Sequence, residues 1–209
     1  MPDMGLLEGI VAFRFASFCR ELGDELRVVV DVGCRLGWAG HMLAAIAGRP
    51  VEVVGLDVYE PYLKTLSEIS KIYKPIKVDL EKEPIPLPDG FADLTICIEV
   101  IEHLSKPAGY RLMDEMERIT RKGGYIHLTT PNGWRPTDSR RCDPLKHKSG
   151  WTVQDFAKRG YVVKGYGFRP IIGRTKIDKL YLVADYVWTP IAPIIPETGF
   201  GLEALKKIT

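Results

Sequence analysis

Apolar residues follow two different periods along the chain. Short β-branched runs, typical of buried strands, occupy residues 27–32, 51–56, 76–78, 92–98, 125–130, 161–168 and 200–208. Between them, apolar residues recur every three or four positions, which predicts helices over 6–22, 41–47, 61–72, 106–120, 152–159 and 177–188. This alternation predicts an α/β fold, with a mostly parallel seven-stranded sheet and helices on both faces.

The N-terminal helix is expected to cover this sheet. Arg14 and Glu21 lie on other faces of the helix, away from its apolar stripe. The apolar positions, at helical spacing, are Leu7, Ile10, Val11, Phe18 and Leu22.

No internal repeat, low-complexity tract or Ser/Gly linker divides the chain, so we expect a single domain over residues 1–209. Within it we expect the covering helix in 1–27, the ligand-binding core in 28–168, and a variable tail in 169–209 that holds an apolar insertion and a closing strand.

The tail segment over residues 177–196 is apolar and rich in aromatic residues. Asp185 and the prolines at 190, 193 and 196 interrupt it, so we expect no stable membrane insertion. We expect the segment to pack on the core. A lid over an apolar substrate, a face for a homo-oligomer and a weak membrane contact are the alternatives.

The composition is that of an ordinary soluble domain. Of the 209 residues, 45% are hydrophobic and 27% are charged, which excludes a disordered polymer, a collagen-like rod and a disulfide-stapled miniprotein. The formal net charge is +2, so nothing indicates nucleic acid as an obligatory partner. The four cysteines are scattered, and Asp3, Glu8 and Arg14 interrupt any export signal. A reducing, cytoplasmic location is therefore expected.

A glycine-containing turn, Asp31-Val-Gly-Cys-Arg-Leu-Gly-Trp, follows the first strand segment. The dinucleotide pattern G-x-G-x-x-G is broken by Arg35 and Trp38, so pyrophosphate binding is disfavoured. The pattern acidic-x-Gly-x-Gly-x-Gly is matched at Asp31, Gly33 and Gly37 and departs only at Arg35. It resembles the first motif of class I S-adenosylmethionine-dependent methyltransferases, whose donor carries an ammonium and a sulfonium that suit an acidic residue. Alternatively, the glycines only shape a turn.

Two more carboxylates follow the next two strand segments. Asp57 can accept both hydroxyls of a ribose, although this feature alone does not separate the methyl donor from NAD. After the third strand, the resemblance places the donor's adenine against Asp79 and Leu80. By itself, each of these acidic residues could equally be a solvated loop carboxylate.

The segment over residues 91–104 resembles two methyltransferase groups, those that modify quinone precursors and those that methylate the terminal ribose of small RNAs. Gly123-Gly124, Thr129-Thr130-Pro131-Asn132, His147 and Trp151 extend the resemblance, which covers residues 28 to about 168. It implies a Rossmann-like fold with S-adenosylmethionine as cofactor. The donor contacts it implies are Asp31, Gly33, Cys34, Gly37, Trp38, Asp57, Val58, Asp79, Leu80 and Glu99.

Glu99, Glu102 and His103 are spaced i, i+3, i+4, so a helical turn would put them on one face. Two carboxylates and an imidazole can hold Mg²⁺ or another divalent cation. In some members of both resembled groups this cluster binds a metal, in the RNA group with a distant histidine, whose place His147 would take. Alternatively, Glu102 caps the helix and His103 supports the cleft wall.

A hydroxyl acceptor must lose its proton during methyl transfer, which a histidine can accept. His103 is the first candidate base and His147 the second, with Glu102 beside them, whereas His41 is expected to be packed or on the surface. Neither an Asn-Pro-Pro-Tyr motif nor a Pro-Cys pair is present, so oxygen acceptors are favoured over exocyclic amines and pyrimidine carbons.

We therefore expect O-methylation of a small organic molecule. RNA ribose 2'-O-methylation is one alternative, favoured by the basic residues Arg135, Arg140, Arg141, Lys146 and Lys148, which could equally form a solvated loop. The other is a noncatalytic donor-binding or scaffold protein, in which Arg35 obstructs the pocket.

Overall fold

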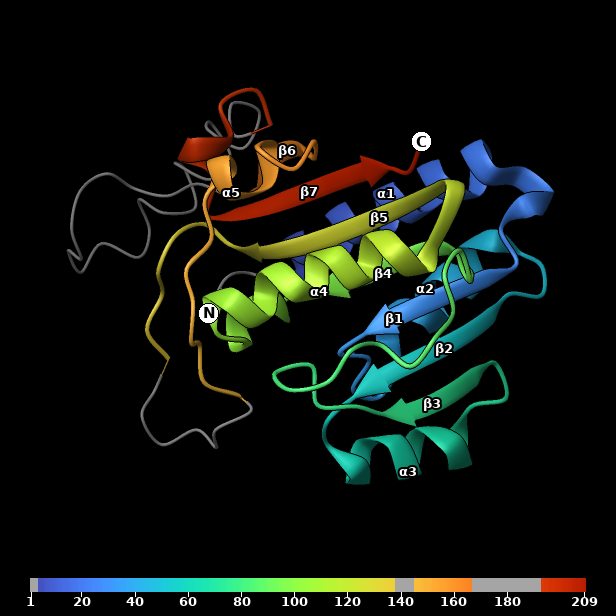
Figure 1. The fold of residues 1–209 in the computed structure, drawn as a ribbon. Coiled ribbons are helices and arrows are strands. Elements are labelled where there is room, and N and C mark those ends of the chain that lie inside the picture. The colour runs from blue at the N-terminus through green and yellow to red at the C-terminus, as the bar shows by residue number, and fades with distance from the viewer. Residues whose placement is uncertain (1–3, 138–144, 167–192) are drawn as a thin grey trace.

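The computed structural model describes residues 4–137, 145–166 and 193–209, and it consists of a twisted sheet with helices on both faces (Figure 1). The strands are β1 (Val28–Val32), β2 (Glu52–Asp57), β3 (Tyr73–Lys77), β4 (Ala92–Ile98), β5 (Thr120–Pro131), β6 (Val162–Tyr166) and β7 (Gly201–Lys207). The helices are α1 (Met4–Leu22), α2 (Trp38–Ala47), α3 (Glu60–Ile69), α4 (Lys106–Ile119) and α5 (Val153–Ala157). Short 3-10 turns are η1 (Gly23–Glu25), η2 (Ile101–His103) and η4 (Pro196–Thr198).

The strands form one seven-stranded sheet in the order β3-β2-β1-β4-β5-β7-β6. The first five strands are parallel, whereas β7 runs antiparallel to both β5 and β6. The mostly parallel α/β fold expected from the sequence is thus confirmed, including the closing strand. The helix expected over 177–188 and most of the apolar tail segment lie outside the described residues.

Side chains of the central strands alternate between two cores, one on each face of the sheet. On β1, Val29 packs into one core, whereas Val30 and Val32 pack into the other. On β4, Ile96 and Cys97 likewise face opposite sides. Because both faces are buried, these strands are mostly apolar on both sides, with Asp31 on β1 and Asp93 and Thr95 on β4 as the polar exceptions.

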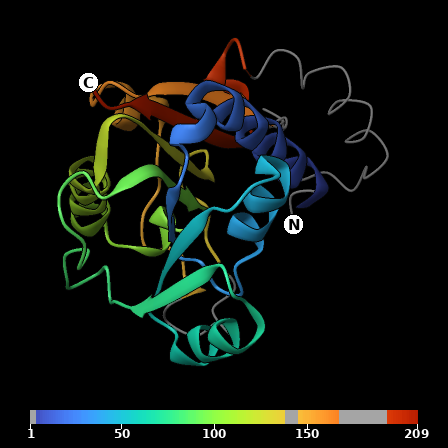
Figure 2. The same ribbon diagram turned by 90° about the vertical axis from the view of Figure 1, so that its right-hand side faces the viewer.

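The two cores are closed by different helices. The core on one face contains apolar residues of α1, α2 and α3, and the core on the other contains those of α4 and α5. Figure 2, which views the sheet from its side, shows α1 and α2 across the sheet from α4. The arrows of β1 to β5 point the same way in Figure 1, so the loops that follow them gather at one edge, called here the carboxyl edge.

One expectation about α1 is wrong. Glu21 faces solvent, but Arg14 points into the sheet, where its guanidinium binds both carboxylate oxygens of Glu203 on β7 at 3.0 and 2.9 Å. On its other side, Glu203 lies 3.1 Å from Nε2 of His127, which is fully buried against Phe15. A single arginine among apolar residues is thus part of the packed face, because its charge has a partner there.

This ion pair determines how two groups titrate. Burial alone would raise the pKa of Glu203, but hydrogen bonds from His127 and Arg14 lower it to about 2. Burial lowers the pKa of His127 below its ordinary value. Both groups take up protons at higher pH in the unfolded chain than in the folded one, so both make folding less favourable as the pH falls.

Replacing Arg14 by Met tests this interaction. The change leaves a buried carboxylate without its cation, and we expect the free energy of unfolding at pH 7 to fall by roughly 3–5 kcal/mol. In the unchanged chain, the free energy of unfolding should decline as the pH falls below 6.5, because His127 takes up a proton on unfolding. It should decline again below 4.5, because Glu203 does the same. The second decline should be weaker in Arg14→Met. Urea unfolding between pH 3 and 8 measures both effects. Arg20→Met, on the exposed side of the same helix, should change the free energy by less than about 0.5 kcal/mol, and an equally small effect of Arg14→Met would contradict the assignment.

Candidate functional site

The loop between β1 and α2 keeps the shape of a glycine turn although one glycine is replaced. Gly33 and Gly37 have φ angles of 71° and 79°, and Arg35 between them has a φ of 50°. This left-handed conformation costs a non-glycine residue roughly 1–2 kcal/mol. The Arg35 side chain is exposed, with Cζ 5.9 Å from the centre of the Tyr62 ring, so it extends over α3.

Asp57, the last residue of β2, lies beside this loop. Its Oδ2 accepts a hydrogen bond from the backbone N–H of Arg35, and its Oδ1 accepts one from Tyr59, both at 2.9 Å. A carboxylate oxygen has two lone pairs, so each oxygen keeps the capacity to accept a further hydroxyl. The backbone bonds also fix the orientation of the carboxylate, as a ribose-binding group requires.

Asp31 is placed deeper than the sequence suggests. It is only 3% exposed, and its Oδ2 accepts a 2.5 Å hydrogen bond from the Tyr73 hydroxyl. Burial raises its pKa to about 7, although the Tyr73 hydrogen bond acts in the opposite direction. Its neighbour Cys34 is also buried, and burial raises the pKa of that thiol.

Of the remaining residues expected to bind the donor, Trp38 begins α2 and packs on the core, whereas Val58 is 39% exposed after β2. Asp79 binds the Lys82 ammonium at 2.8 Å, and this hydrogen bond lowers its pKa. Leu80 packs on the core and lines a cavity of about 300 Å³.

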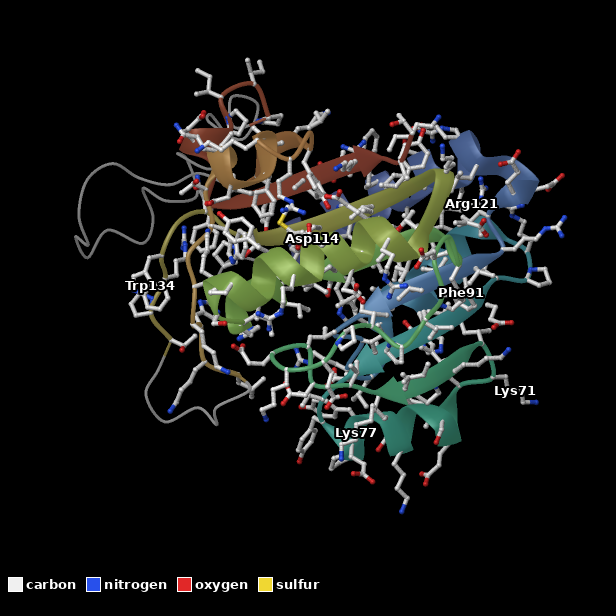
Figure 3. All side chains as sticks on the ribbon, viewed as in Figure 1. Lys71, Lys77, Phe91, Asp114, Arg121 and Trp134 are labelled. Carbon is white, nitrogen blue, oxygen red and sulfur yellow. The ribbon has the colours of Figure 1, made fainter. Side chains whose placement is uncertain are left out.

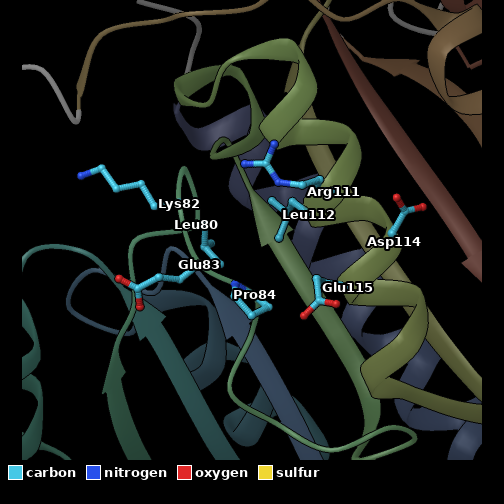
Figure 4. A pocket seen from close by; sticks show the side chains of 8 residues that line it. All are labelled: Leu80, Lys82, Glu83, Pro84, Arg111, Leu112, Asp114 and Glu115. Atoms are coloured by element: carbon cyan, nitrogen blue, oxygen red, sulfur yellow. The ribbon is translucent and has the colours of Figure 1, made fainter.

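This cavity lies between the loop after β3 and helix α4. In Figure 4, side chains of the two elements face each other across it, with Leu80 and Pro84 on one side and Arg111, Leu112 and Glu115 on the other. It therefore opens beside the last residue of the expected adenine site.

Glu102, His103 and His147 come together although His147 is distant in sequence. One ligand atom from each lies within 4.8 Å of the others, and the two imidazole rings are 4.9 Å apart between centres. The segment that carries His147 is held in place because Lys148 and Ser149 donate backbone hydrogen bonds to the carbonyl of Glu102 at 2.8 and 3.2 Å.

Trp151 anchors the same segment from below. Its ring is fully buried, donates a 2.8 Å hydrogen bond to the Ser149 hydroxyl, and lies under the Lys106 ammonium, 3.7 Å from the ring centre. A Cβ at Gly109 would approach this ring to 2.3 Å, so α4 needs a glycine there to pack against Trp151. Helix α4 thus fixes the position of His147 through Trp151.

Hydrogen bonds indicate the tautomers of both histidines. Nδ1 of His103 lies 3.2 Å from the carbonyl of Lys146, and Nδ1 of His147 lies 2.8 Å from that of Arg135. A carbonyl only accepts, so Nδ1 carries the hydrogen and the lone pair of the neutral ring is on Nε2. His103 Nε2 is 4.0 Å from the Glu102 carboxylate.

The Glu102 carboxylate is almost completely buried and accepts a 2.9 Å hydrogen bond from the Thr130 hydroxyl. Burial, with the nearby negative charge of Glu99, raises its pKa well above the ordinary value. Glu99 itself has a φ of 54°, and its carboxylate accepts a 2.8 Å hydrogen bond from Tyr166. Burial also raises the pKa of Glu99.

The sequence-based picture of this cluster needs one correction. A helical turn after β4 would have put Glu99, Glu102 and His103 on one face, but the backbone is left-handed at Glu99, and only Ile101–His103 forms a 3-10 turn. The group of three therefore holds Glu102, His103 and His147, and the Glu99 carboxylate binds Tyr166 instead.

The structure also adds contacts that the sequence did not predict, including one made by Thr130, which the sequence had singled out only as part of the resemblance. Tyr73, Thr130 and Tyr166 each donate a hydroxyl hydrogen bond to an expected site carboxylate. No local pattern indicates them, because each reaches its partner only through strand pairing. His41 lies at the surface, with Nδ1 at 2.7 Å from the Gly37 carbonyl and Nε2 at 2.9 Å from the Ser70 hydroxyl.

The basic segment after β5 is only partly described. The Arg135 guanidinium lies 3.2 Å from the centre of the Phe200 ring and donates to the Phe200 carbonyl at 3.0 Å. Arg140 and Arg141 lie outside the described residues. Next to Arg135, Trp134 is 55% exposed and projects from the carboxyl edge (Figure 3).

None of the helices in residues 4–137, 145–166 and 193–209 combines the length and apolar character needed to cross a membrane.

Residues 30–128 match the family described as a methyltransferase domain. A probable S-adenosylmethionine-dependent methyltransferase of Mycolicibacterium smegmatis is 33% identical over 109 residues, which are 51% of this chain and 38% of that protein. A ubiquinone biosynthesis O-methyltransferase of Bordetella bronchiseptica is 29% identical over 108 residues, 50% of this chain and 42% of that protein. The chain thus matches about two fifths of the length of these curated relatives.

Solved structures share the fold. A SAM-dependent methyltransferase from Archaeoglobus fulgidus superposes with a TM-score of 0.59 at 19% identity, covering 94% of this chain and 92% of the other. A putative methyltransferase of Haloferax volcanii, solved in complex with the Trm112 methyltransferase activator, gives 0.61 at 14% identity, covering 93% and 87%. The family match over residues 30–128, the sheet order and the glycine loop agree with one another, and the chain is similar to S-adenosylmethionine-dependent methyltransferases and shares their fold.

Proposed function

We propose that the chain transfers the methyl group of S-adenosylmethionine to an oxygen atom of a small organic molecule. The observation that carries this proposal is the pairing, at one edge of the sheet, of a fixed carboxylate at Asp57 with the imidazoles of His103 and His147. The carboxylate is suited to binding a nucleoside, and the imidazoles are suited to removing a hydroxyl proton. Bound S-adenosylmethionine would supply the activated methyl group.

The glycine loop and Asp57 would hold the donor. Asp57 would accept the ribose hydroxyls through the lone pairs left by its two backbone hydrogen bonds. The exposed position of Arg35 over Tyr62 supports donor binding over the alternative in which this arginine blocks the loop.

His103 would act as the general base. Its Nδ1–H is directed at the Lys146 carbonyl, so Nε2 carries the lone pair that accepts a proton. The Glu102 carboxylate, 4.0 Å away, would stabilise the resulting imidazolium when it is ionised. The hydroxyl oxygen of the acceptor would form a bond to the methyl carbon while the carbon–sulfur bond of the donor breaks. The hydroxyl proton would pass to Nε2 of His103. Positioning of the reacting groups would lower the activation barrier by about 7–11 kcal/mol, which is the larger contribution. Base catalysis would add a rate factor of roughly 10²–10⁴.

A divalent cation held by the same residues is the alternative to base catalysis by His103, because the single Nε2 lone pair of His103 can bind either a proton or the cation. Glu102, His103 and His147 offer one oxygen and two nitrogen ligands, a mixed set that suits Mn²⁺, Fe²⁺, Co²⁺ or Zn²⁺ better than Mg²⁺. Each imidazole donates its other ring nitrogen to a backbone carbonyl, as metal-binding histidines usually do. A cation there would offset the burial of the Glu102 carboxylate.

Asp57→Asn tests donor binding. The change removes the charge and one acceptor oxygen, so we expect the dissociation constant for S-adenosylmethionine, measured by calorimetry, to rise about 10- to 100-fold. Asp89→Asn, on an exposed carboxylate paired with Arg118, should leave the constant unchanged. If the chain carrying wild-type Asp57 binds neither the donor nor its demethylated product, the proposed function is wrong and the scaffold alternative is favoured.

Transfer of a labelled methyl group tests the reaction. We expect label from S-adenosylmethionine in phenols or other small hydroxyl compounds, and a loss of about 10²-fold or more in kcat for His103→Gln with little change in donor affinity. Asp89→Asn, the exposed control used above, should leave kcat unchanged. Label in RNA, with binding that weakens steeply as salt rises, would instead support ribose methylation.

Titration with Mn²⁺ tests the cation. We expect binding that is weakened at least about tenfold in both Glu102→Gln and His147→Ala, because each removes one ligand. Glu83→Gln, an exposed carboxylate on the loop after β3, should bind as the unchanged chain does. Absence of binding, or equal binding in all four proteins, would eliminate this site.

A further inference from the structure

Tyr73, the first residue of β3, fills the space beneath the glycine loop. A Cβ atom added at Gly37 would lie 2.7 Å from the Tyr73 ring, one at Gly40 would lie 2.2 Å from its hydroxyl, and one at Gly55 would lie 2.9 Å from its ring. These glycines belong to the loop, to α2 and to β2. The loop, α2 and β2 therefore each have a glycine at the position where a side chain would clash with Tyr73.

The Tyr73 hydroxyl joins the loop to Asp31. It accepts a hydrogen bond from the backbone N–H of Gly40 at 2.9 Å and lies 2.5 Å from Oδ2 of Asp31 and 3.0 Å from the Gly37 carbonyl. The hydroxyl has one proton to donate. The Gly37 carbonyl already accepts from the backbone N–H and the ring Nδ1 of His41, so the shorter bond to Asp31 receives that proton.

The surroundings of Asp31 otherwise oppose its charge. Asp57 at the end of β2 adds a second negative charge, and the thiols of Cys34 in the loop and Cys97 on β4 are close enough for its charge to raise their pKa values. Burial raises the pKa of Asp31 to about 7, so both of its protonation states are populated near neutral pH. The hydrogen bond from Tyr73 favours the ionised state.

We propose that Tyr73 is a positioning residue for the methyl donor, whose hydroxyl favours the ionised form of Asp31 and fixes the glycine loop above it. An ionised Asp31 places a negative charge beneath the loop, where it attracts the ammonium and sulfonium of S-adenosylmethionine. By linkage, a bound cation favours the ionised carboxylate in return. This inference rests on the proposed function, because it assigns Tyr73 a part in donor binding.

Tyr73→Phe tests the proposal, since it keeps the ring that packs against the glycines and removes only the hydroxyl. The dissociation constant of S-adenosylmethionine is measured by calorimetry from pH 6 to 9. In the unchanged chain, the affinity should rise as the pH passes through neutrality. In Tyr73→Phe, the midpoint of this rise should move up by about one pH unit, which makes binding at pH 7 about fivefold weaker because fewer molecules carry an ionised Asp31.

Two variants serve as references. Asp31→Asn should lack the pH step, apart from the titration of the donor's own amino group, which all the proteins share. Tyr125→Phe removes a hydroxyl that also binds a carboxylate, Oε2 of Glu21 at 2.6 Å, and it should behave as the unchanged chain.

The outcomes separate the two proposals. An unshifted midpoint in Tyr73→Phe overturns the inference, even where the affinity falls equally at every pH, since an equal loss indicates packing alone. If the unchanged chain binds no donor at any pH, the proposed function fails instead. If Tyr73→Phe unfolds before binding can be measured, Gly40→Ala is used in its place, because the added methyl group would displace the Tyr73 hydroxyl. The same upward shift of the midpoint is expected in Gly40→Ala, and absence of the shift overturns the inference.

Discussion

The arrangement of the site depends on one constraint: parallel strands end at the same edge, so the acidic residues that end or follow them are gathered and partly removed from water. An ionised carboxylate in such a place is costly unless hydrogen bonds or charges offset the loss of hydration. Each carboxylate here is stabilised by its own hydrogen-bond donors. Asp57 is held by two backbone N–H groups, Asp31 by Tyr73, Glu99 by Tyr166 and Glu102 by Thr130.

Backbone strain is concentrated at the same edge. Within the described residues, Arg35 and Glu99 are the two non-glycine residues with positive φ, and one lies in the glycine loop while the other follows β4. Such conformations persist only where the surroundings enforce them, and they tend to mark functional positions. The Arg35 N–H bonded to Asp57 and the Glu99 carboxylate bonded to Tyr166 are the enforcing contacts, so strain and carboxylate placement have a common origin.

The sequence predicted what depends on local pattern and missed what depends on pairing across the sheet. Continuous apolar runs and helical spacing located the strands of the parallel sheet and the helices that cover it, and the glycine turn located its carboxyl edge. The role of Tyr73 could not be read, because the helical pattern appeared to continue to residue 72, whereas α3 ends at Ile69. Arg14 was misplaced for a related reason, since its partner Glu203 lies 189 residues away.

Two kinds of buried carboxylate distinguish the scaffold from the site. Glu203 lies against His127 and Arg14, whose hydrogen bonds lower its pKa to about 2, so it stays ionised, and its pair with Arg14 secures α1 to the sheet. Asp31 and Glu102 accept their hydrogen bonds from neutral hydroxyls, and burial raises the pKa of both. A positive charge brought to the edge would stabilise these two but would do little for Glu203. The electrostatics therefore favour cationic ligands at this edge, a property that the proposed sulfonium donor has.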